Sequence, residues 1–205
     1  MSVIKKNILS FEQNRREFFS KILPLGSMCC LGCNACFASE KTEKKHKFME
    51  DSGMSFQQVF DFTFKQFYVP VMKSLEKEIG KEAFIEKLKK AGSEVGAQWG
   101  RDVLKILQKN DMATLVAWIK EGGPYKHLQT FEIVEETDKT LELKVSECLY
   151  AKTFREADAS DIGYAAICYS EYAWEYAFNP KIKFIRPQTL MQGNDFCHAR
   201  WVVEA

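Results

Sequence analysis

Hydrophobic residues recur at helical spacing in the middle of the chain, and this pattern predicts three helices. The first helix spans about 56–71, where Pro70 is expected to kink its end. The second spans about 82–108, and the third covers about 111–121 and stops at the sequence Gly122-Gly123-Pro124. The folded region is therefore expected to begin with helices rather than strands.

Two features share the second predicted helix. One face carries an apolar stripe that the helical period predicts to be buried. Its members are Phe84, Leu88, Ala91, Val95, Trp99, Val103 and Ile106. Beside the stripe stand three glycines at four-residue spacing, which are Gly92, Gly96 and Gly100. Glycines so spaced form a flat ridge on a helix, and we expect another backbone to pack closely against it.

The hydrophobic period changes to two after the third helix, which indicates strands. Residues 128–135 are strand-like, with Phe131 and Ile133 prominent, and apolar positions alternate with polar ones over 141–146. The polar turn at 136–139 joins these segments, so the pattern predicts a β-hairpin.

More helices and a second hairpin follow the first hairpin. We predict a short helix at about 150–157, a longer one at about 161–178, and two strands within 183–203. The dipeptide Gly193-Asn194 is a favourable two-residue turn, so the second hairpin is expected to reverse there. This order predicts an α+β fold, with N-terminal helices packed on an antiparallel sheet that is built from two hairpins with intervening helices.

Composition and charge narrow the class of protein. The 205 residues include 16 Phe, 7 Tyr and 4 Trp, enough for a sizeable core, and residues 53–205 suit a single domain. Residues 1–38 carry a net charge of +3, which leaves a net charge of −2 on the rest. A nearly neutral domain without a basic stripe argues against a nucleic-acid partner. The sequence has no uncharged apolar run long enough for an ordinary membrane span.

The N-terminal segment resembles a twin-arginine export signal. Between Asn14 and Lys21, two adjacent arginines precede two bulky apolar residues and a lysine, and a weakly apolar stretch follows over 22–38. An amphipathic helix is the alternative, but the proline and glycines of this stretch would break it. We predict a leader at 1–38 that engages the twin-arginine translocase, and a linker at 39–52. The domain would be exported to the periplasm or the outer face of the cytoplasmic membrane.

The leader holds four cysteines whose role the sequence leaves open. Cleavage after Ala38 would remove them, whereas a degenerate lipobox ending at Cys33 would attach a lipid there and make the protein a lipoprotein. Membrane contact is expected only through the leader or such an anchor. The C-x-x-C-x-x-C spacing also suits an iron–sulfur cluster, although the usual fourth ligand is absent nearby. The four are Cys29, Cys30, Cys33 and Cys36.

Three cysteines lie in the predicted domain, each in a different element. Cys148 ends a strand, Cys168 lies within the long helix, and Cys197 lies in the last strand. Helical spacing puts Glu171 beside Cys168 on one face. Strand alternation points His198 away from Cys197, so this dipeptide is not expected to form a Cys–His dyad.

Three interpretations of these cysteines remain open. They are small buried residues of the core, or two of them form a disulfide and leave one free thiol. Alternatively, they form a thiolate site that acts as a nucleophile or holds a divalent metal. The metal ligands would then be Cys148, Cys168 and Cys197, and Glu171 or Asp195 is the best candidate for a base. The sequence identifies no other cofactor.

The same cysteines carry a resemblance to a known family. The sequence matches it at Glu147-Cys148, at Cys168–Glu171, at Asn179-Pro180, and in the TLMQGND-x-C segment over 189–197. These motifs are similar to the L-2-amino-thiazoline-4-carboxylic acid hydrolase family, and the likeness covers roughly 50–203.

The resemblance implies a hydrolase that opens the ring of a small cyclic, amidine-like substrate. By resemblance, Cys148, Cys168 and Cys197 are functional positions, with Glu171 and Asp195 beside them. The alternative function is an exported domain that binds a metal or small ligand through the same cysteines without turnover.

Two arginines of the second hairpin are candidates for binding a substrate carboxylate. They are Arg186 and Arg200. Arginine presents a planar fork of N–H donors that matches a carboxylate. The other interpretation is that both are surface residues of the hairpin.

Overall fold

The structure, a computed structural model, describes residues 53–123 and 125–204. The leader predicted at 1–38, Cys33 within it, and the linker predicted at 39–52 lie outside the described residues. Residues from Phe56 onward form one compact unit. None of the helices in the described part of the chain is long and apolar enough to cross a membrane.

The first helical region runs through α4 (Phe56–Asp61), the π-helical η2 (Phe62–Tyr68) and α5 (Val69–Ile79). The prediction that it ends near Pro70 is wrong, because α5 carries this proline in its first turn and continues to Ile79. Proline has no N–H to donate. The N–H of the preceding residue donates to a carbonyl five residues back, and this wider π turn leads into the proline.

The next helices agree with the predicted ranges. They are α6 (Lys81–Leu107), α7 (Met112–Ala117) and the π-helical η3 (Trp118–Gly122). The short α8 (Tyr125–Leu128) follows, and the sequence did not predict it. Asp111 caps α7, because its side chain accepts a hydrogen bond from the Thr114 N–H at 2.8 Å.

The buried face of α6 is only partly the apolar stripe that helical spacing predicts. Phe84 and Val103 are buried, but Val95 is 70 % exposed and Trp99 is 40 % exposed. The glycine ridge packs inward instead: a Cβ at Gly92 would lie 3.1 Å from two carbonyl oxygens of the neighbouring helical segment. The prediction of close backbone packing is confirmed, and this packing rotates the stripe toward the edge of the contact.

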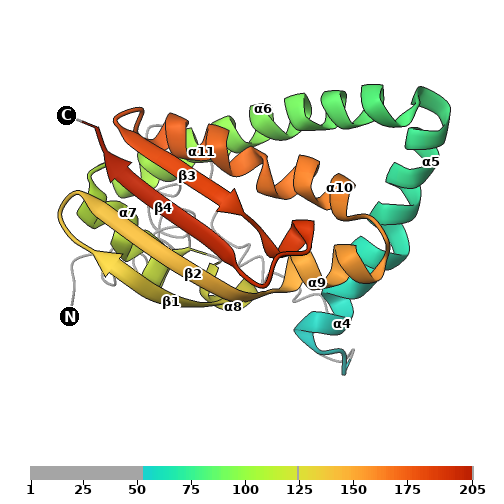
Figure 1. Cartoon of the computed structure of the whole chain (residues 1–205), viewed down its shortest axis with the longest axis horizontal. Coiled ribbons are helices and arrows are strands. Elements are labelled where there is room, and N and C mark those ends of the chain that lie inside the picture. Colours follow the sequence, from blue (N-terminus) through green and yellow to red (C-terminus); the bar gives the residue numbers. More distant parts are fainter. Residues whose placement is uncertain (1–52, 124, 205) are drawn as a thin grey trace, which may run out of the picture. The chain divides into compact units, whose positions relative to one another are not determined.

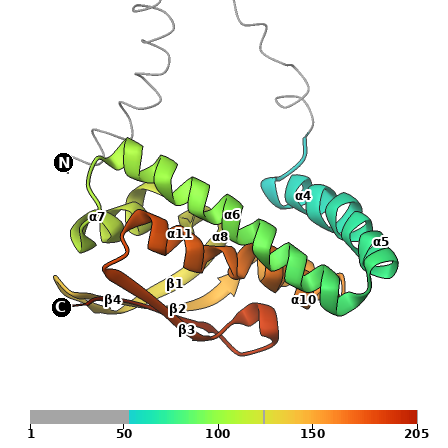
Figure 2. The same cartoon turned by 90° about the horizontal axis from the view of Figure 1, so that it is seen from above.

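Four strands form one antiparallel sheet in the order β1-β2-β4-β3 (Figure 1). The strands are β1 (Gln129–Glu136), β2 (Thr140–Cys148), β3 (Ile182–Gln188) and β4 (Cys197–Val203). The two hairpins meet where β2 pairs with β4. The helices gather on one face of this sheet, with α6 lying over α11 (Ser170–Phe178) (Figure 2). The predicted α+β fold is confirmed.

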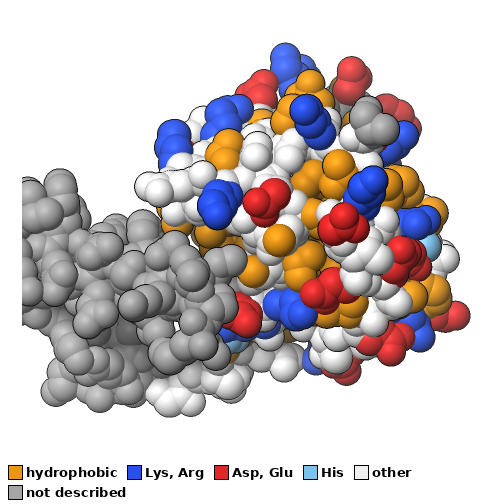
Figure 3. Space-filling model, turned by 90° about the vertical axis from the view of Figure 1, so that its left-hand side faces the viewer, with side chains coloured by type: hydrophobic (Ala, Val, Ile, Leu, Met, Phe, Trp, Pro, Cys, Tyr) orange, Lys and Arg blue, Asp and Glu red, His pale blue; other side chains and the backbone are white. Residues whose placement is uncertain are grey.

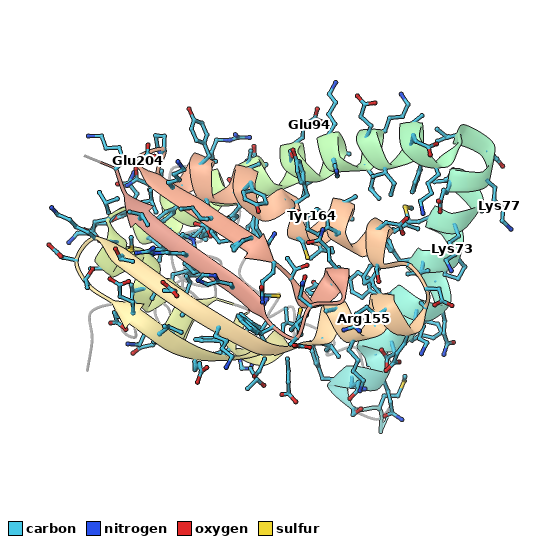
Figure 4. The ribbon with its side chains drawn as sticks, viewed as in Figure 1. Lys73, Lys77, Glu94, Arg155, Tyr164 and Glu204 are labelled. Atoms are coloured by element: carbon cyan, nitrogen blue, oxygen red, sulfur yellow. The ribbon has the colours of Figure 1, made fainter. Side chains whose placement is uncertain are left out.

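The second hairpin does not reverse at a two-residue turn, so that prediction is wrong. Residues 189–196 form a longer connection that contains the 3-10 turn η5 (Leu190–Gln192). Gly193 follows this turn with φ +92°, a left-handed conformation that glycine adopts without strain. Arg155, labelled in Figure 4, ties the connection to α9 (Leu149–Glu156) by donating to the Leu190 carbonyl oxygen at 3.3 Å.

The long helix predicted at 161–178 is interrupted by a π-helical turn. Its parts are α10 (Ser160–Gly163), the π-helical η4 (Tyr164–Cys168) and α11. The Tyr169 N–H donates to the Tyr164 carbonyl oxygen at 2.8 Å, five residues back. Single π turns within helices often occur at functional sites.

The two faces of the sheet differ in polarity because side chains alternate along each strand. Leu141, Leu143 and Val145 of β2 are buried beneath the helices, as are Ala199 and Trp201 of β4. The opposite face is largely polar, with the pairs Glu142–Arg200 and Lys144–His198, although Ile185 beside Arg200 is also exposed there. Figure 3 shows another side of the protein, where basic and acidic side chains are interspersed with apolar ones.

Candidate functional site

A cavity of about 330 Å³ lies between the sheet and the helices that cover it. Its walls come from α6, η4, α11, β2, β3 and β4, and most of its lining side chains are apolar. The cavity lies where two clusters of the hydrophobic core meet: Leu143 and Trp201 belong to one cluster, and Val145 and Met191 belong to the other. The core is therefore hollow at the junction of its two halves.

The three cysteines of the described residues all line this cavity. Cys148 is the last residue of β2, Cys168 is the last residue of η4, and Cys197 is the first residue of β4. All three are free thiols, so the structure contains no disulfide between them. The fold brings together three residues, of which the first and the last are 49 positions apart in the sequence.

Burial keeps the three thiols in their neutral form. It raises the pKa of Cys168 to about 12, although the nearby Arg186 guanidinium acts in the opposite direction. Burial also raises the pKa of Cys148 and of Cys197. The N–H groups of Tyr150 and Ala151 at the start of α9 favour a Cys148 thiolate, but they do not outweigh burial. The cavity at neutral pH therefore presents thiols rather than thiolates.

The raised pKa of Cys168 predicts a loss of stability at alkaline pH. In the unfolded chain this thiol ionises near its ordinary pKa of 9.0, whereas in the folded protein it stays protonated to about 12. Its contribution to the free energy of unfolding is therefore complete below pH 9 and is lost as the pH rises toward 12, at about 1.4 kcal/mol per pH unit. Urea unfolding of wild type and Cys168→Ala between pH 8 and pH 11, values chosen to span roughly this window, measures the difference. If the free energies of unfolding of the two proteins changed with pH in parallel, the prediction would be contradicted.

Arg186 and Glu171 form a buried ion pair in the wall of the cavity. The Arg186 side chain is 5 % exposed and the Glu171 side chain is 19 % exposed. One guanidinium nitrogen of Arg186 donates to the Glu171 carboxylate, and the other donates to the backbone carbonyl oxygen of Cys168. Its third nitrogen, Nε, is buried, and no group in the described part of the chain forms a hydrogen bond with it. Arg186 thus links the Glu171 carboxylate to the backbone at the end of the π turn, and Glu171 and Cys168 both line the cavity.

The cavity contains a second carboxyl group that the sequence did not single out as functional. Glu175 lies one helical turn after Glu171 on α11, lines the same cavity and is 2 % exposed. Its Oε2 atom has no hydrogen-bond partner among the described residues. The i, i+4 spacing from Glu171 was the available signal, but helical spacing alone does not distinguish a cavity wall from a surface.

Two other residues predicted for the site lie outside the lining of the cavity. Asp195 is exposed and precedes β4. Arg200 lies on the opposite face of β4, where it pairs with Glu135 and Glu142 at 3.5 and 3.4 Å. His198 shares that face, with its Nε2 atom 2.9 Å from the Glu142 carboxylate. The expectation that His198 points away from Cys197 is confirmed.

The geometry does not support the metal hypothesis. Among the described residues, no three His, Cys, Asp or Glu side chains are grouped closely enough to hold a metal ion. Cys148, Cys168 and Cys197 share a cavity without forming a ligand cluster. A further wide groove of about 880 Å³ lies outside the cavity, and Cys148 lines both of them. Cys148 therefore occupies the boundary between the groove and the cavity.

Comparisons with known proteins give one match in sequence and remote likenesses in structure. The model of the family described as L-2-amino-thiazoline-4-carboxylic acid hydrolase matches residues 61–201, more than half of the chain. No curated protein matches the chain.

Two solved structures are similar at low identity. A trafficking protein particle complex subunit 3 from Naegleria fowleri, covalently bound to palmitic acid, is 9% identical with a TM-score of 0.46, covering 72% of this chain and 96% of that one. The phenol-responsive sensory domain of the transcription activator PoxR with phenol is 10% identical with a TM-score of 0.39, covering 65% and 71%. Neither likeness bears on the function of this chain.

Proposed function

This chain belongs to the L-2-amino-thiazoline-4-carboxylic acid hydrolase family, and on that premise we propose that it opens a small cyclic substrate by hydrolysis at an amidine-like carbon. The observation that carries the proposal is that three thiols and the Glu171–Arg186 ion pair line one cavity. A nucleophile, a carboxylate and a cation in one largely apolar site are the parts that such a reaction requires.

The size of the cavity supports a small substrate. Its volume of about 330 Å³ is near the lower end of the roughly 300–1,000 Å³ that is usual for ligand pockets. A five-membered ring with a carboxylate fits within this space with room to spare. The apolar walls, which include Trp99, Phe131 and Trp201, suit a flat ring.

Cys148 is the best candidate for the attacking thiol. It lies at the boundary of the outer groove and the cavity, so a substrate that enters through the groove reaches it first. It also stands at the N-terminus of α9, where the Ala151 N–H favours its thiolate. Cys168, by contrast, has its pKa raised to about 12 and is the least suited of the three to ionise.

Arg186 and Glu171 have complementary roles in this proposal. The unpaired Nε–H of Arg186 is available to donate to an acceptor on the substrate, such as a carboxylate oxygen. The Glu171 carboxylate, held in place by Arg186, accepts the proton that the attacking thiol or water gives up.

Ligand binding without turnover is the second candidate function. The neutral state of all three thiols favours it, because a thiol that stays protonated does not attack. A small apolar ligand would then occupy the cavity unchanged.

Export of the domain rests on the sequence alone and stays a prediction, which fractionation of cells that express the full chain would test.

The full chain is the material for testing the hydrolase. Incubation with 2-amino-thiazoline-4-carboxylate is expected to consume the ring, which its absorbance follows. We expect Cys148→Ser to lower kcat by about 100-fold or more, because a hydroxyl is a far weaker nucleophile than a thiol at the same position.

Two outcomes would count against the assignment of the nucleophile or of the reaction. If Cys148→Ser had the same kcat as wild type, Cys148 would not be the nucleophile. Binding of the intact ring without consumption by wild type would favour the second function. Asp195→Asn tests the sequence-based prediction that Asp195 is a base. Because Asp195 lies outside the cavity, we expect this substitution to leave turnover unchanged.

A further inference from the structure

Two carboxyl groups on one face of α11 occupy contrasting surroundings within the same cavity. Glu171 contacts the guanidinium of Arg186, and its side chain is 19 % exposed. Glu175, one turn further along, is 2 % exposed, and it forms no ion pair within the part of the chain that the structure describes. Its Oε2 atom is buried without a hydrogen-bond partner.

These surroundings favour opposite protonation states. The ion pair with Arg186 stabilises the charged form of Glu171. Burial raises the pKa of Glu175 well above its ordinary value of 4.5, and the nearby Trp201 indole, which favours the charged form, does not reverse that direction. A pair of carboxyls whose environments separate their protonation states is a recurring arrangement for a general base beside a general acid.

We propose that Glu175 is the general acid of the reaction proposed above, a carboxyl group that contacts the substrate in the cavity and protonates the ring atom that leaves. Glu171 is its partner as the general base. The inference rests on the proposed function, because it assigns a role within the same reaction.

The protons and bonds of this scheme balance with water as the only co-reactant. The Cys148 sulfur bonds to the amidine-like carbon and its proton passes to Glu171. One ring bond to that carbon then breaks, and Glu175 gives its proton to the departing ring atom. Water adds to the carbon and returns a proton to Glu175. The bond to Cys148 breaks last, and its sulfur recovers the proton from Glu171.

An unpaired donor in the same wall points to a ligand. The Nε of Arg186 is buried and makes no hydrogen bond within the described part of the chain, and Arg186 lines the cavity with Glu175. A buried polar group without a partner costs about 1–3 kcal/mol, so native proteins rarely leave one unsatisfied. A substrate with an acceptor atom would satisfy this donor, and its leaving atom would accept from Glu175.

The titratable groups that face the cavity come from several elements. Besides Glu175 itself, they are Glu171, Arg186, Tyr150, Cys148, Cys168 and Cys197. The residues that α6 contributes to the lining, Val95, Gly96 and Trp99, carry no charge. Arg186 is the one cation in the lining, and it is already paired with Glu171.

Stability against pH tests the protonation state of Glu175 without an activity assay. Because its pKa is raised in the folded protein, its contribution to stability is complete below about pH 4.5 and is lost as the pH rises toward the folded pKa. Glutamine cannot titrate. The urea midpoint of Glu175→Gln is therefore expected to rise relative to wild type with increasing pH, and to level off above the folded pKa. A pH-independent difference would overturn the inference.

Turnover of Glu175→Gln tests the catalytic role. Glutamine keeps the shape of a neutral carboxyl group but cannot give up a proton, so kcat is expected to fall by about 100-fold or more while KM changes little. Wild-type kcat is expected to decline as the pH rises through the pKa of Glu175, and the variant is expected to lack that decline. The matched control is Glu94→Gln at an exposed position of α6, labelled in Figure 4, which should leave kcat unchanged.

The outcomes separate this inference from the function on which it rests. If wild type hydrolyses the ring and Glu175→Gln retains full kcat, Glu175 is not the acid, and the hydrolase proposal stands. If wild type binds the ring but does not hydrolyse it, both the hydrolase and its general acid are overturned. If wild type hydrolyses the ring and Glu175→Gln loses kcat but keeps its KM, the result supports both the hydrolase and the role of Glu175 as its general acid.

Discussion

Replacing Arg186 with methionine is expected to lower the free energy of unfolding by about 3–5 kcal/mol and to abolish the ring opening proposed above. The substitution leaves the Glu171 carboxylate, which is 19 % exposed, without its cation, and a buried charge that loses its partner is costly. It also removes the hydrogen bond to the Cys168 carbonyl oxygen at the end of the π turn. Urea unfolding of the full chain measures the loss.

Two variants show whether the loss arises from the unpaired charge. The double variant Arg186→Met/Glu171→Gln removes both charges and is expected to recover part of the stability. Lys120→Met breaks an exposed ion pair with Glu136, whose partners are 41 % and 39 % exposed, and should cost at most about 1 kcal/mol. An Arg186→Met protein as stable as Lys120→Met would contradict a buried ion pair.

Gly96→Ala is expected to destabilise the protein by about 1–3 kcal/mol, although alanine is the better helix former. A Cβ at this position would overlap the carbonyl oxygen of Ser170, at the start of α11, so one backbone must move. Both residues line the cavity, and the displacement should therefore lower turnover as well. Thermal unfolding and the ring-opening assay measure the two effects.

Gly92→Ala, one turn earlier on α6, is the matched control. There a Cβ would lie 3.1 Å from the nearest carbonyl oxygens, so a shift of a few tenths of an ångström accommodates it. The gain in helix propensity, about 1 kcal/mol, is expected to offset this strain and leave the stability near that of wild type. Equal effects at the two positions would mean that the glycine ridge is not what sets the distance between the helices.

Local pattern was sufficient to predict most elements of the fold. Hydrophobic residues at a period of 3.6 predicted α6, and a period of two predicted β1 and β2 with the polar turn between them. The local pattern failed where burial depended on how the elements pack together. Val95 and Trp99 lie on the apolar stripe of α6, yet they are exposed because the ridge turned that face away from the contact. Gly193 is left-handed as its sequence suggests, but it ends a 3-10 turn rather than forming a hairpin turn.

By itself, the sequence determined the family, the α+β class and the residue types of the site. Helical spacing put Glu171 beside Cys168, and strand alternation separated His198 from Cys197, because both relations depend on neighbours within one element. Only the tertiary structure decided which of these residues meet. The pairing of β2 with β4 and the packing of α11 bring Cys148, Cys168 and Cys197 to one cavity and leave Asp195 in solvent.

The protonation states also depended on the tertiary structure. Glu171 and Glu175 are the same residue type on the same helix face, and no local pattern distinguishes them. The difference arises because β3 places Arg186 against Glu171, while Glu175 is buried and no cation of residues 53–123 or 125–204 pairs with it. Whether a carboxyl or thiol is charged is set by burial and by the charges that other elements place beside it, and these are properties of the folded chain.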